Sequence, residues 1–312
     1  MKSARITGWG TALPDKVVTN ADLETMLDTT DEWIFERSGI RERRIGGTTS
    51  TLAVAAGAAA LAKAGIAPGD IDLLILCTTT PDQQVPATSA VVQHELGLSC
   101  GAFDVNAACS GFVYGLVTAF QFISTGTIER VLVIGSEALS RIVDWDDRTT
   151  AVLFADGAGA VVLAAADGGE RGSHLLGWDL GCDGSARSIL DADIGGYLRM
   201  EGREVFRRAV RVMIDSGRRT MEQAGVTADD IALVVPHQAN IRIIESANAK
   251  LGLSMERTAL VLDHTGNTSS ASVPLALVDA IRNDRVSADD LILFIGFGAG
   301  MTWASALVRW DP

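Results

Sequence analysis

The chain has 312 residues, of which 47% are hydrophobic and 21% are charged, and its formal net charge at pH 7 is −13. This composition predicts a folded protein with a large core, and it argues against extensive disorder and against nucleic acid as a general partner. The N-terminal residues contain no long apolar segment, and no run of about 18 uncharged apolar residues follows, so we expect no signal peptide, no membrane span and a cytoplasmic protein.

Helix-like and strand-like segments alternate along the chain, which predicts an α/β fold. Asp70–Thr80 is expected to be a buried strand that ends in three threonines. Ala102–Val105 is predicted as a short strand, and Gly111–Phe122 as a buried helix because its apolar residues recur at spacings of three and four. The small residues between these two segments predict a tight turn.

Cys109 lies in this turn, close to the expected first turn of the helix. Free backbone N–H groups and the positive end of the helix dipole favour an anion there, so the sequence predicts a stabilised thiolate and a candidate nucleophile. The alternative is a cysteine that packs as a small buried hydrophobe. The other cysteines (Cys77, Cys100 and Cys182) form no C-x-x-C pair, so neither a zinc site nor a disulfide framework is expected.

The middle of the chain contains three stretches with different expected roles. Ala151–Ala166 is predicted as two strands separated at Asp156-Gly157. Gly168–Gly172 has the composition of a linker, and we place a boundary there between residues 1–170 and residues 171–312. Asp183–Gly196 is polar and rich in glycine, without periodicity, and is expected to be a surface loop.

Glu204–Gln223 is predicted as an amphipathic helix. At 100° per residue, five arginines fall within an arc of roughly 120°, opposite an apolar face. The basic face could bind an acidic partner, or it could be an ordinary solvated face. The arginines are Arg207, Arg208, Arg211, Arg218 and Arg219, and the apolar residues are Phe206, Val210, Met213, Ile214 and Met221.

Polar or glycine-rich segments follow three further strand-like stretches. Ile231–Val235 is followed by His237, in the position where open α/β folds place ligand-binding groups. Leu260–Asn267 is predicted as an apolar strand ending in Asn267, which alternatively caps the next helix. Leu291–Ile295 leads into GFGAG, Gly296–Gly300, which lacks the third glycine of a dinucleotide fingerprint but offers backbone N–H groups for an oxyanion.

An internal repeat relates the two parts of the chain. The segment from Ala62 to Thr80 resembles that from Glu222 to Asn240 at an offset of 160, and Arg130–Ala138 resembles Leu291–Ala299 at an offset of 161. At an offset of 160, Cys109 corresponds to Ser269. Matches in the same order at almost the same offset predict two similar α/β halves with a site where they meet.

Seven motifs, spread over almost the whole chain, are similar to those of the thiolase-like condensing enzymes, and specifically of β-ketoacyl-acyl-carrier-protein synthase III. This resemblance implies a five-layered α-β-α-β-α fold of two duplicated halves and a homodimer. The motifs are DEWIFERSGIRERR, DVNAACSGFVYGL, DGAGAVVL, MEGREVF, VVPHQANIRII, DHTGNTSSASVPLAL and GFGAGMTWASALVRW.

The resemblance also implies the reaction. Cys109 would take an acyl group from acyl-CoA, with the N–H groups of Cys109 and Ala299 as oxyanion hole. His237 and Asn267 would then stabilise the enolate formed by decarboxylation of malonyl-acyl-carrier protein, which attacks the acyl-cysteine. No cofactor or metal is implied, and the partners are acyl-CoA and the carrier protein, with no nucleic acid or membrane.

The same resemblance assigns residues to the substrates. Val85 and Phe297 are expected at the acyl pocket, where Val85 is smaller than the Phe of some relatives and would leave room for longer or branched primers. The residues that would bind CoA are Trp33, Arg37, Arg148, Asn240 and Arg242. The expected dock for the acidic carrier protein consists of Arg207, Arg208, Arg211 and Arg242, with Lys250 as a further candidate.

Three other functions remain open at this point. A ketosynthase III that selects primers for a polyketide pathway would share the three catalytic residues. A thioester hydrolase with Cys, His and Asn would use the same groups, although the local signature of papain-type enzymes is missing around Cys109. A non-catalytic thioester-binding module is the third alternative.

Overall fold

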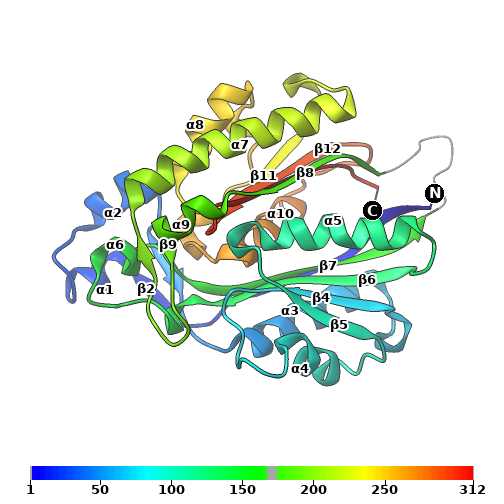
Figure 1. Ribbon diagram of the computed structural model, residues 1–312, viewed down its shortest axis with the longest axis horizontal. Coiled ribbons are helices and arrows are strands. Elements are labelled where there is room, and N and C mark those ends of the chain that lie inside the picture. Colours follow the sequence, from blue (N-terminus) through cyan, green and yellow to red (C-terminus); the bar gives the residue numbers. More distant parts are fainter. Residues whose placement is uncertain (1, 167–173, 312) are drawn as a thin grey trace.

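The computed structural model describes residues 2–166 and 174–311, and its elements form five layers in the order helix, sheet, helix, sheet, helix (Figure 1). The five-layered α/β architecture expected from the sequence is confirmed. The predicted linker Gly168–Gly172 and the boundary at residue 170 lie outside the described residues. Among the described residues, no helix has both the length and the apolar character needed to cross a bilayer.

The first sheet has the strand order β1-β7-β6-β4-β5. β4 runs parallel to β5 and to β6, whereas β7 is antiparallel to β6 and to β1. Every residue of β4 is buried, as expected for a central parallel strand covered by helices on both faces. The strands are β1 (Ser3–Ala12), β4 (Leu73–Cys77), β5 (Gly101–Val105), β6 (Arg130–Ala138) and β7 (Asp156–Ala166).

The second sheet has the order β11-β12-β13-β8, in which only β11 and β12 are parallel. Two apolar helices, α5 and α10, lie between the sheets (Figure 1). The strands are β8 (Leu175–Cys182), β11 (Leu233–Pro236), β12 (Leu291–Gly298) and β13 (Thr302–Arg309). The helices of the three helical layers are α3 (Thr49–Ala64), α4 (Thr88–Glu95), α5 (Gly111–Ser124), α7 (Gly202–Ala224), α8 (Ile241–Leu251) and α10 (Ser272–Arg282).

The two sheets repeat one connectivity. The order β1-β7-β6-β4 in the first sheet corresponds to β8-β13-β12-β11 in the second, with the same parallel and antiparallel neighbours. The helices α3 and α7 end before glycines with left-handed backbone, Gly65 and Gly225, which are 160 residues apart. The internal repeat seen in the sequence is therefore a repeat of the fold.

The counterpart of β5 is missing from the second sheet. The predicted strand Leu260–Asn267 is wrong: an isolated bridge between Val234 and Thr258 replaces it, and Leu262–Thr265 forms the short helix α9. The Val261 carbonyl accepts hydrogen bonds from the Thr265 backbone and side chain. The segment is apolar because Val261 and Leu262 are buried in helical packing, and not because they belong to a strand.

Two equivalent turns precede the central helices. Turn η2 (Ala108–Ser110) leads into α5, and turn η7 (Ser269–Ala271) leads into α10. Ala108 and Ser269 both have a φ of 49°, and they are 161 residues apart. Cys109 therefore corresponds to Ser270, and the predicted match to Ser269 is wrong by one residue.

Two other predictions fail between the sheets. Ala151–Ala166 is not a pair of strands, because α6 ends at Ala151 and a single strand, β7, begins at Asp156. The Asp156 carboxylate accepts N–H groups of Gly46 and Ser140, so it anchors neighbouring loops and does not mark a turn between strands. Asp183–Gly196 is only partly a surface loop, since it contains η4 and β9 and buries Leu190.

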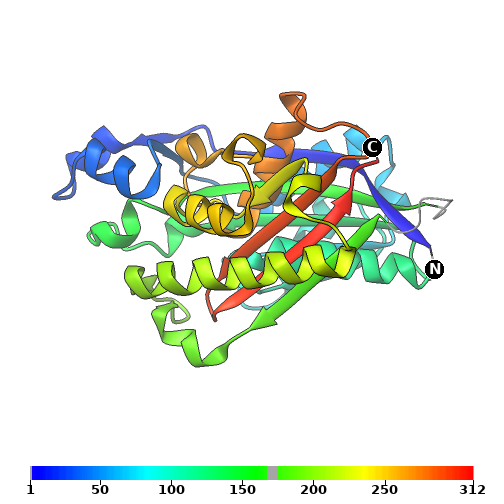
Figure 2. The ribbon, with the colours of Figure 1, turned by 90° about the horizontal axis from the view of Figure 1, so that it is seen from above.

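Helix α7 confirms the predicted amphipathic helix and crosses the outer face of the second sheet (Figure 2). Met213 and Met221 of the predicted apolar face are buried, and Phe206, Val210 and Ile214 are half-buried. The remaining elements are β2 (Val17–Thr19), β3 (Glu42–Arg44), β9 (Leu190–Asp191), β10 (Arg199–Met200), α1 (Asn20–Glu24), α2 (Asp31–Ser38), α6 (Arg148–Ala151), η1 (Pro68–Asp70), η3 (Leu139–Arg141), η4 (Gly184–Ile189), η5 (Ala228–Asp230) and η6 (Met255–Arg257).

Candidate active site

Cys109 occupies the middle of turn η2, and only 7% of it is exposed. Side chains fix the turn on both sides: Asn106 Oδ1 accepts the Ala108 N–H at 3.2 Å, and the Ala107 carbonyl accepts the hydroxyls of Ser110 at 2.7 Å and Thr302 at 2.8 Å. This tight turn between β5 and α5 can form because the residues around Cys109, which are Ala107, Ala108 and Ser110, have small side chains.

His237 follows β11 and is 1% exposed. Its Nδ1 lies 2.7 Å from Ser272 Oγ, and its ring packs edge-on against Phe297 with centroids 5.3 Å apart. Ser272 Oγ also accepts the Gln238 N–H at 3.2 Å. When the Ser272 hydroxyl donates to Nδ1, the proton of the neutral imidazole lies on Nε2. Nε2 is buried and has no hydrogen-bond partner within residues 2–166 and 174–311.

Asn267 precedes turn η7 and is 5% exposed. Its backbone bonds to Leu153 and Ala155, and its Oδ1 accepts the Ser269 N–H at 2.9 Å. Because the side-chain oxygen is used in this way, the NH₂ group is the end of the amide that remains available to a ligand.

Cys109, His237 and Asn267 line one cavity of about 120 Å³, although they come from three distant segments. Its other lining groups are mostly apolar and include Phe297, which was expected at the acyl pocket. Toward α8 and α7 the cavity reaches Asn240 and Phe206. The site is thus a largely apolar space that brings together the Cys109 sulfur, the His237 imidazole and the Asn267 carboxamide.

A second, larger cavity of about 510 Å³ also reaches Cys109 and shares Phe154 and Leu190 with the first. Ala299 lines it beside Cys109, and Ser269 lines it as well. Its apolar residues are Leu139, Ile142, Phe154, Leu190 and Leu198, and its polar side chains are Thr79, Asn106, Arg187 and Asp191.

Burial sets the protonation of both reactive groups. It raises the pKa of Cys109 to about 12, against a smaller opposite effect of the Ser269 hydroxyl, and it lowers the pKa of His237 to about 3. At neutral pH the free site therefore holds a neutral thiol and a neutral imidazole. The predicted stabilisation of the thiolate by the helix dipole is wrong for the resting state, because desolvation of the sulfur outweighs it.

The residues predicted to bind CoA form two groups. The Trp33 ring has guanidinium groups of Arg37 at 4.5 Å and of Arg148 at 5.1 Å from its centre. Asn240 Nδ2 donates to the Arg37 carbonyl at 2.7 Å, which joins this group to the smaller cavity. The Arg242 guanidinium lies 5.8 Å from the Phe206 ring, which lines the same cavity.

The structure separates the residues predicted for the carrier dock. Arg207, Arg208 and Arg211 line a groove of about 360 Å³ beneath α7 that also contains Trp303, whereas Arg242 is not part of it. Acidic residues partly neutralise the groove: Glu204 binds Arg207 and Arg208, Asp183 binds Arg208, and Asp215 lies 3.8 Å from Arg211.

Val85, predicted for the acyl pocket, is 82% exposed and lines neither cavity that contains Cys109. Conversely, Ser272, Phe154 and Leu190 were not predicted as site residues. Ser272 is one of several serines in GNTSSAS, and only the fold shows which of them meets the imidazole. No three His, Cys, Asp or Glu side chains in the described part of the chain are grouped to hold a metal ion.

Residues 103–184 match the family described as 3-oxoacyl-[acyl-carrier-protein (ACP)] synthase III, and residues 221–310 match its C-terminal region. The chain is 51% identical to β-ketoacyl-[acyl-carrier-protein] synthase III of Erythrobacter litoralis over 99% of this chain and 100% of that protein. A crystal structure of 3-oxoacyl-[acyl-carrier-protein] synthase III from Aquifex aeolicus has a TM-score of 0.96 at 46% identity, covering 99% and 100%. The priming β-ketosynthase of the R1128 polyketide pathway has a TM-score of 0.94 at 36% identity, covering 99% and 97%.

Proposed function

The chain belongs to the 3-oxoacyl-[acyl-carrier-protein] synthase III family, and from this premise we propose that it condenses an acyl-CoA primer with malonyl-acyl-carrier protein, with loss of CO₂, to initiate fatty acid synthesis. It is an acyltransferase that works through an acyl-cysteine. The observation that carries the proposal is the single buried cavity shared by Cys109, His237 and Asn267. A polyketide role is disfavoured, because similarity to the fatty acid enzymes is higher.

In the first half-reaction, Cys109 Sγ attacks the thioester carbonyl of acyl-CoA. The C–S bond to CoA breaks, the acyl group stays on Cys109, and the thiol proton leaves on the CoA sulfur. The developing oxyanion would accept the N–H groups of Cys109 and Ala299, which lie together at the larger cavity. Because the free thiol is neutral, proton removal has to accompany the attack.

In the second half-reaction, malonyl-acyl-carrier protein replaces CoA. The His237 Nε2–H and the Asn267 NH₂ group donate to its thioester oxygen, so the bond to the carboxylate can break with the charge held as an enolate. The enolate carbon attacks the acyl-cysteine, the β-ketoacyl-carrier product leaves, and the Cys109 thiolate takes up one proton. The apolar walls exclude water, which would otherwise hydrolyse the acyl-cysteine.

Acyl-CoA would enter past Trp33. Its adenine fits the ring that Arg37 and Arg148 flank, and the arginines together with Arg242 suit its phosphates. Asn240 lies where the pantetheine arm would reach the smaller cavity. No cofactor is needed for this chemistry.

For the acidic carrier protein we assign the basic groove of Arg207, Arg208 and Arg211, together with Arg242 on α8, which lies outside that groove. Exposure of Arg207 and Arg211 supports this assignment. Charge reversal of both, in a R207E/R211E variant, should raise KM for the carrier more at low salt than at high salt. Equal kinetics at both salt concentrations would place the dock elsewhere.

We further propose a cytoplasmic homodimer in which Val85 of one copy closes the larger cavity of the other. The exposed apolar side chains of Val85, Ile194 and Tyr197 support an interface, because such groups are costly in water. A small residue at this position would admit longer or branched primers.

Intact mass after incubation with a panel of acyl-CoAs tests the function. A stable adduct on Cys109 that malonyl-acyl-carrier protein converts into a β-ketoacyl product supports the synthase. Loss of the adduct to water would instead indicate a thioester hydrolase, and absence of any adduct a binding module. The primer that loads fastest separates a fatty acid role from a polyketide role.

A further inference from the structure

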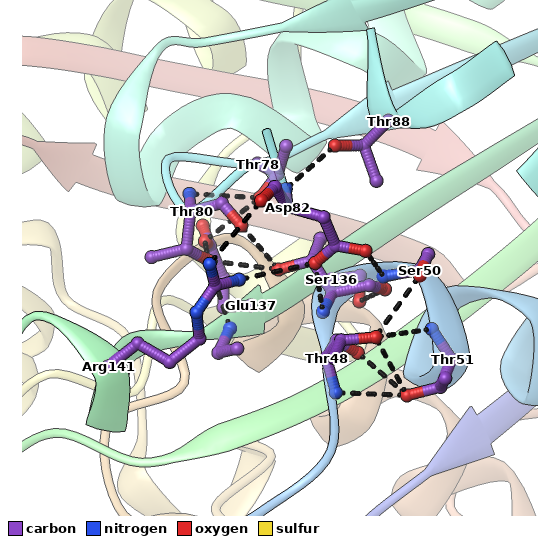
Figure 3. A network of polar contacts seen from close by, with 12 residues as sticks. Thr48, Ser50, Thr51, Thr78, Thr80, Asp82, Thr88, Ser136, Glu137 and Arg141 are labelled. Carbon is purple, nitrogen blue, oxygen red and sulfur yellow. Dashed lines mark hydrogen bonds and ion pairs between the residues drawn. The ribbon is translucent and has the colours of Figure 1, made fainter. Parts of the chain in front are cut away.

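A fully buried carboxylate, Glu137, lies at the end of β6 (Figure 3). Its Oε2 accepts four hydrogen bonds, from the hydroxyls of Thr78 at 3.1 Å, Thr79 at 3.0 Å and Thr80 at 2.7 Å and from the Thr79 N–H at 3.0 Å. Among the described residues, no Lys, Arg or His side chain forms an ion pair with it. A buried charge without a cation is costly, so its donors have to compensate for the lost hydration.

The other oxygen of Glu137 reaches the turn that follows Asn267. Oε1 accepts the Ser270 hydroxyl at 2.8 Å, and the Ser270 N–H points at it from 3.4 Å. The neighbouring Ser269 has a φ of 49°, a strained value for a residue with a side chain, and donates its N–H to Asn267 Oδ1. Strain of this kind persists only where surrounding contacts hold the backbone, and here the Glu137 carboxylate is one of these contacts, beside Asn267 Oδ1 and the Cys77 carbonyl.

The internal repeat contains an equivalent turn that has no contact like that between Glu137 and Ser270. Glu137 corresponds to Gly298 in the other half, and Ser270 corresponds to Cys109. A Cβ at Gly298 would lie 2.5 Å from the Cys109 nitrogen, so no side chain can bind that turn from the strand. The carboxylate is therefore a feature of the Asn267 side only.

We propose that Glu137 is a positioning residue for decarboxylation, which holds turn η7 through Ser270 so that the Asn267 NH₂ group faces the cavity. The inference rests on the proposed function, because it assigns Glu137 to the second half-reaction. Cys109 is held in turn η2 by contacts of Asn106, Ser110 and Thr302, and the Asn267 amide has no role in the proposed acyl transfer to Cys109.

Two variants separate the contacts of Glu137 from its charge. Glu137→Ala removes both. Glu137→Gln has nearly the same size and no charge: its amide oxygen can still accept hydrogen bonds from the threonines, and its NH₂ can donate to Ser270 Oγ. The Ser270 hydroxyl would then donate to the Cys77 carbonyl, which already lies 2.8 Å away.

The test measures the two half-reactions separately, as acyl loading of Cys109 by intact mass and as CO₂ release from malonyl-acyl-carrier protein. Glu137→Ala should lower CO₂ release about a hundredfold, the usual effect of losing one oxyanion donor, whereas acyl loading should change by no more than about fivefold, through the charge on Cys109. Glu137→Gln should restore CO₂ release. An equal fall in both half-reactions, or no fall in CO₂ release, would overturn the inference.

Asp156→Ala is the matched control, because Asp156 is equally buried but binds Ser140 and Gly46. It should affect both half-reactions alike. If Glu137→Ala does not fold, Ser270→Ala removes the hydroxyl contacts to Glu137 Oε1 and to the Cys77 carbonyl and leaves the threonine contacts of Oε2 in place. It should lower CO₂ release selectively, by about tenfold for one hydrogen bond. An unselective result with Ser270→Ala would also overturn it. If the unaltered protein loads acyl groups but releases no CO₂, the proposed function fails instead.

Discussion

Turns η2 and η7 have the same backbone conformation, but we assign them different roles. In each, an asparagine accepts the N–H of the residue two positions later: Asn106 from Ala108 at 3.2 Å and Asn267 from Ser269 at 2.9 Å. Each turn also packs against the strand of the other half, η2 against β12 and η7 against β6. The repeat thus produced two equivalent places for a nucleophile at the start of a central helix.

The strands behind the turns differ, and this difference decides which turn is reactive. Behind η2, Gly298 leaves room for the Cys109 backbone beside two cavities. Behind η7, Glu137 fills the equivalent space and binds Ser270. On the proposed function, one half supplies the nucleophile, Cys109, and the other supplies the contacts that orient Asn267.

Replacing the two central residues of the turns should give the largest contrast. Cys109→Ala removes the only group proposed to carry the acyl chain, so condensation should fall by at least a thousandfold, on the order seen when a catalytic nucleophile is lost. Ser270→Ala should still take up an acyl group. Intact mass after incubation with acyl-CoA measures both. An acyl adduct on Cys109→Ala would show that the reactive turn has been misassigned.

The glycine behind η2 gives the next effect. In Gly298→Ala the added Cβ would lie 2.5 Å from the Cys109 nitrogen and 2.8 Å from Ala108 Cβ, so the turn must move. We expect a loss of about 1–3 kcal/mol in the free energy of unfolding and a severe loss of acyl loading. Denaturant titration and intact mass measure the two. Gly184→Ala, where the added carbon meets nothing within 4 Å, is the control; equal behaviour of both variants would contradict the close approach.

Much of this comparison could be predicted from the sequence, since the repeat, the Cys109 turn and the strand-end position of His237 depend on local patterns. The exact alignment of the two halves could not be predicted. The offset changes from 160 to 161 between β11 and η7, where α9 replaces a strand, and no propensity separates Leu262–Thr265 in a helix from an apolar strand.

The rest of the site could not be predicted because it depends on contacts between residues far apart in the sequence. Glu137 and Ser270 are 133 residues apart, and His237 and Ser272 are 35 apart, so no local pattern pairs them. The pKa of Cys109 was predicted in the wrong direction, because the helix dipole is visible in the sequence while the depth of burial is not. Val85 was placed by resemblance, and a single chain does not bring it to either cavity.

The residues at the ends of β4 and β11 differ in how they make the stability depend on pH. Cys77 and His237 are equivalent, 160 residues apart, and both are buried and neutral near pH 7. Burial lowers the pKa of His237 from 6.5 to about 3, so the unfolded state binds more protons between these values. Stability should therefore be full above about pH 6.5 and fall as the pH is lowered. Cys77, whose pKa is raised, contributes nothing in this range.

Urea titrations at pH 7, 6 and 5 check this expectation. The free energy of unfolding of the unaltered protein should fall more steeply toward pH 5 than that of His237→Gln, which carries no titrating group at this position. Parallel slopes would mean that His237 gains a proton in the folded state, and the neutral imidazole assigned to the resting site would be wrong.

The smallest expected effect concerns the negative charge of Glu137, which lies behind η7 and acts on Cys109 in η2. Burial is the main cause of the raised pKa of Cys109, and the Glu137 carboxylate adds to it, whereas the Ser269 hydroxyl opposes it. Glu137→Gln should move the pH profile of alkylation by iodoacetamide to lower pH, with roughly a two- to fivefold faster reaction at pH 9.

The rate is followed on the peptide that contains Cys109, since Cys182 is exposed and reacts independently. Asp156→Asn, which also removes a buried charge, should leave the profile in place. If both profiles coincide with that of the unaltered protein, the carboxylate acts on the Asn267 turn through contact alone, and the two turns are linked mechanically but not electrostatically.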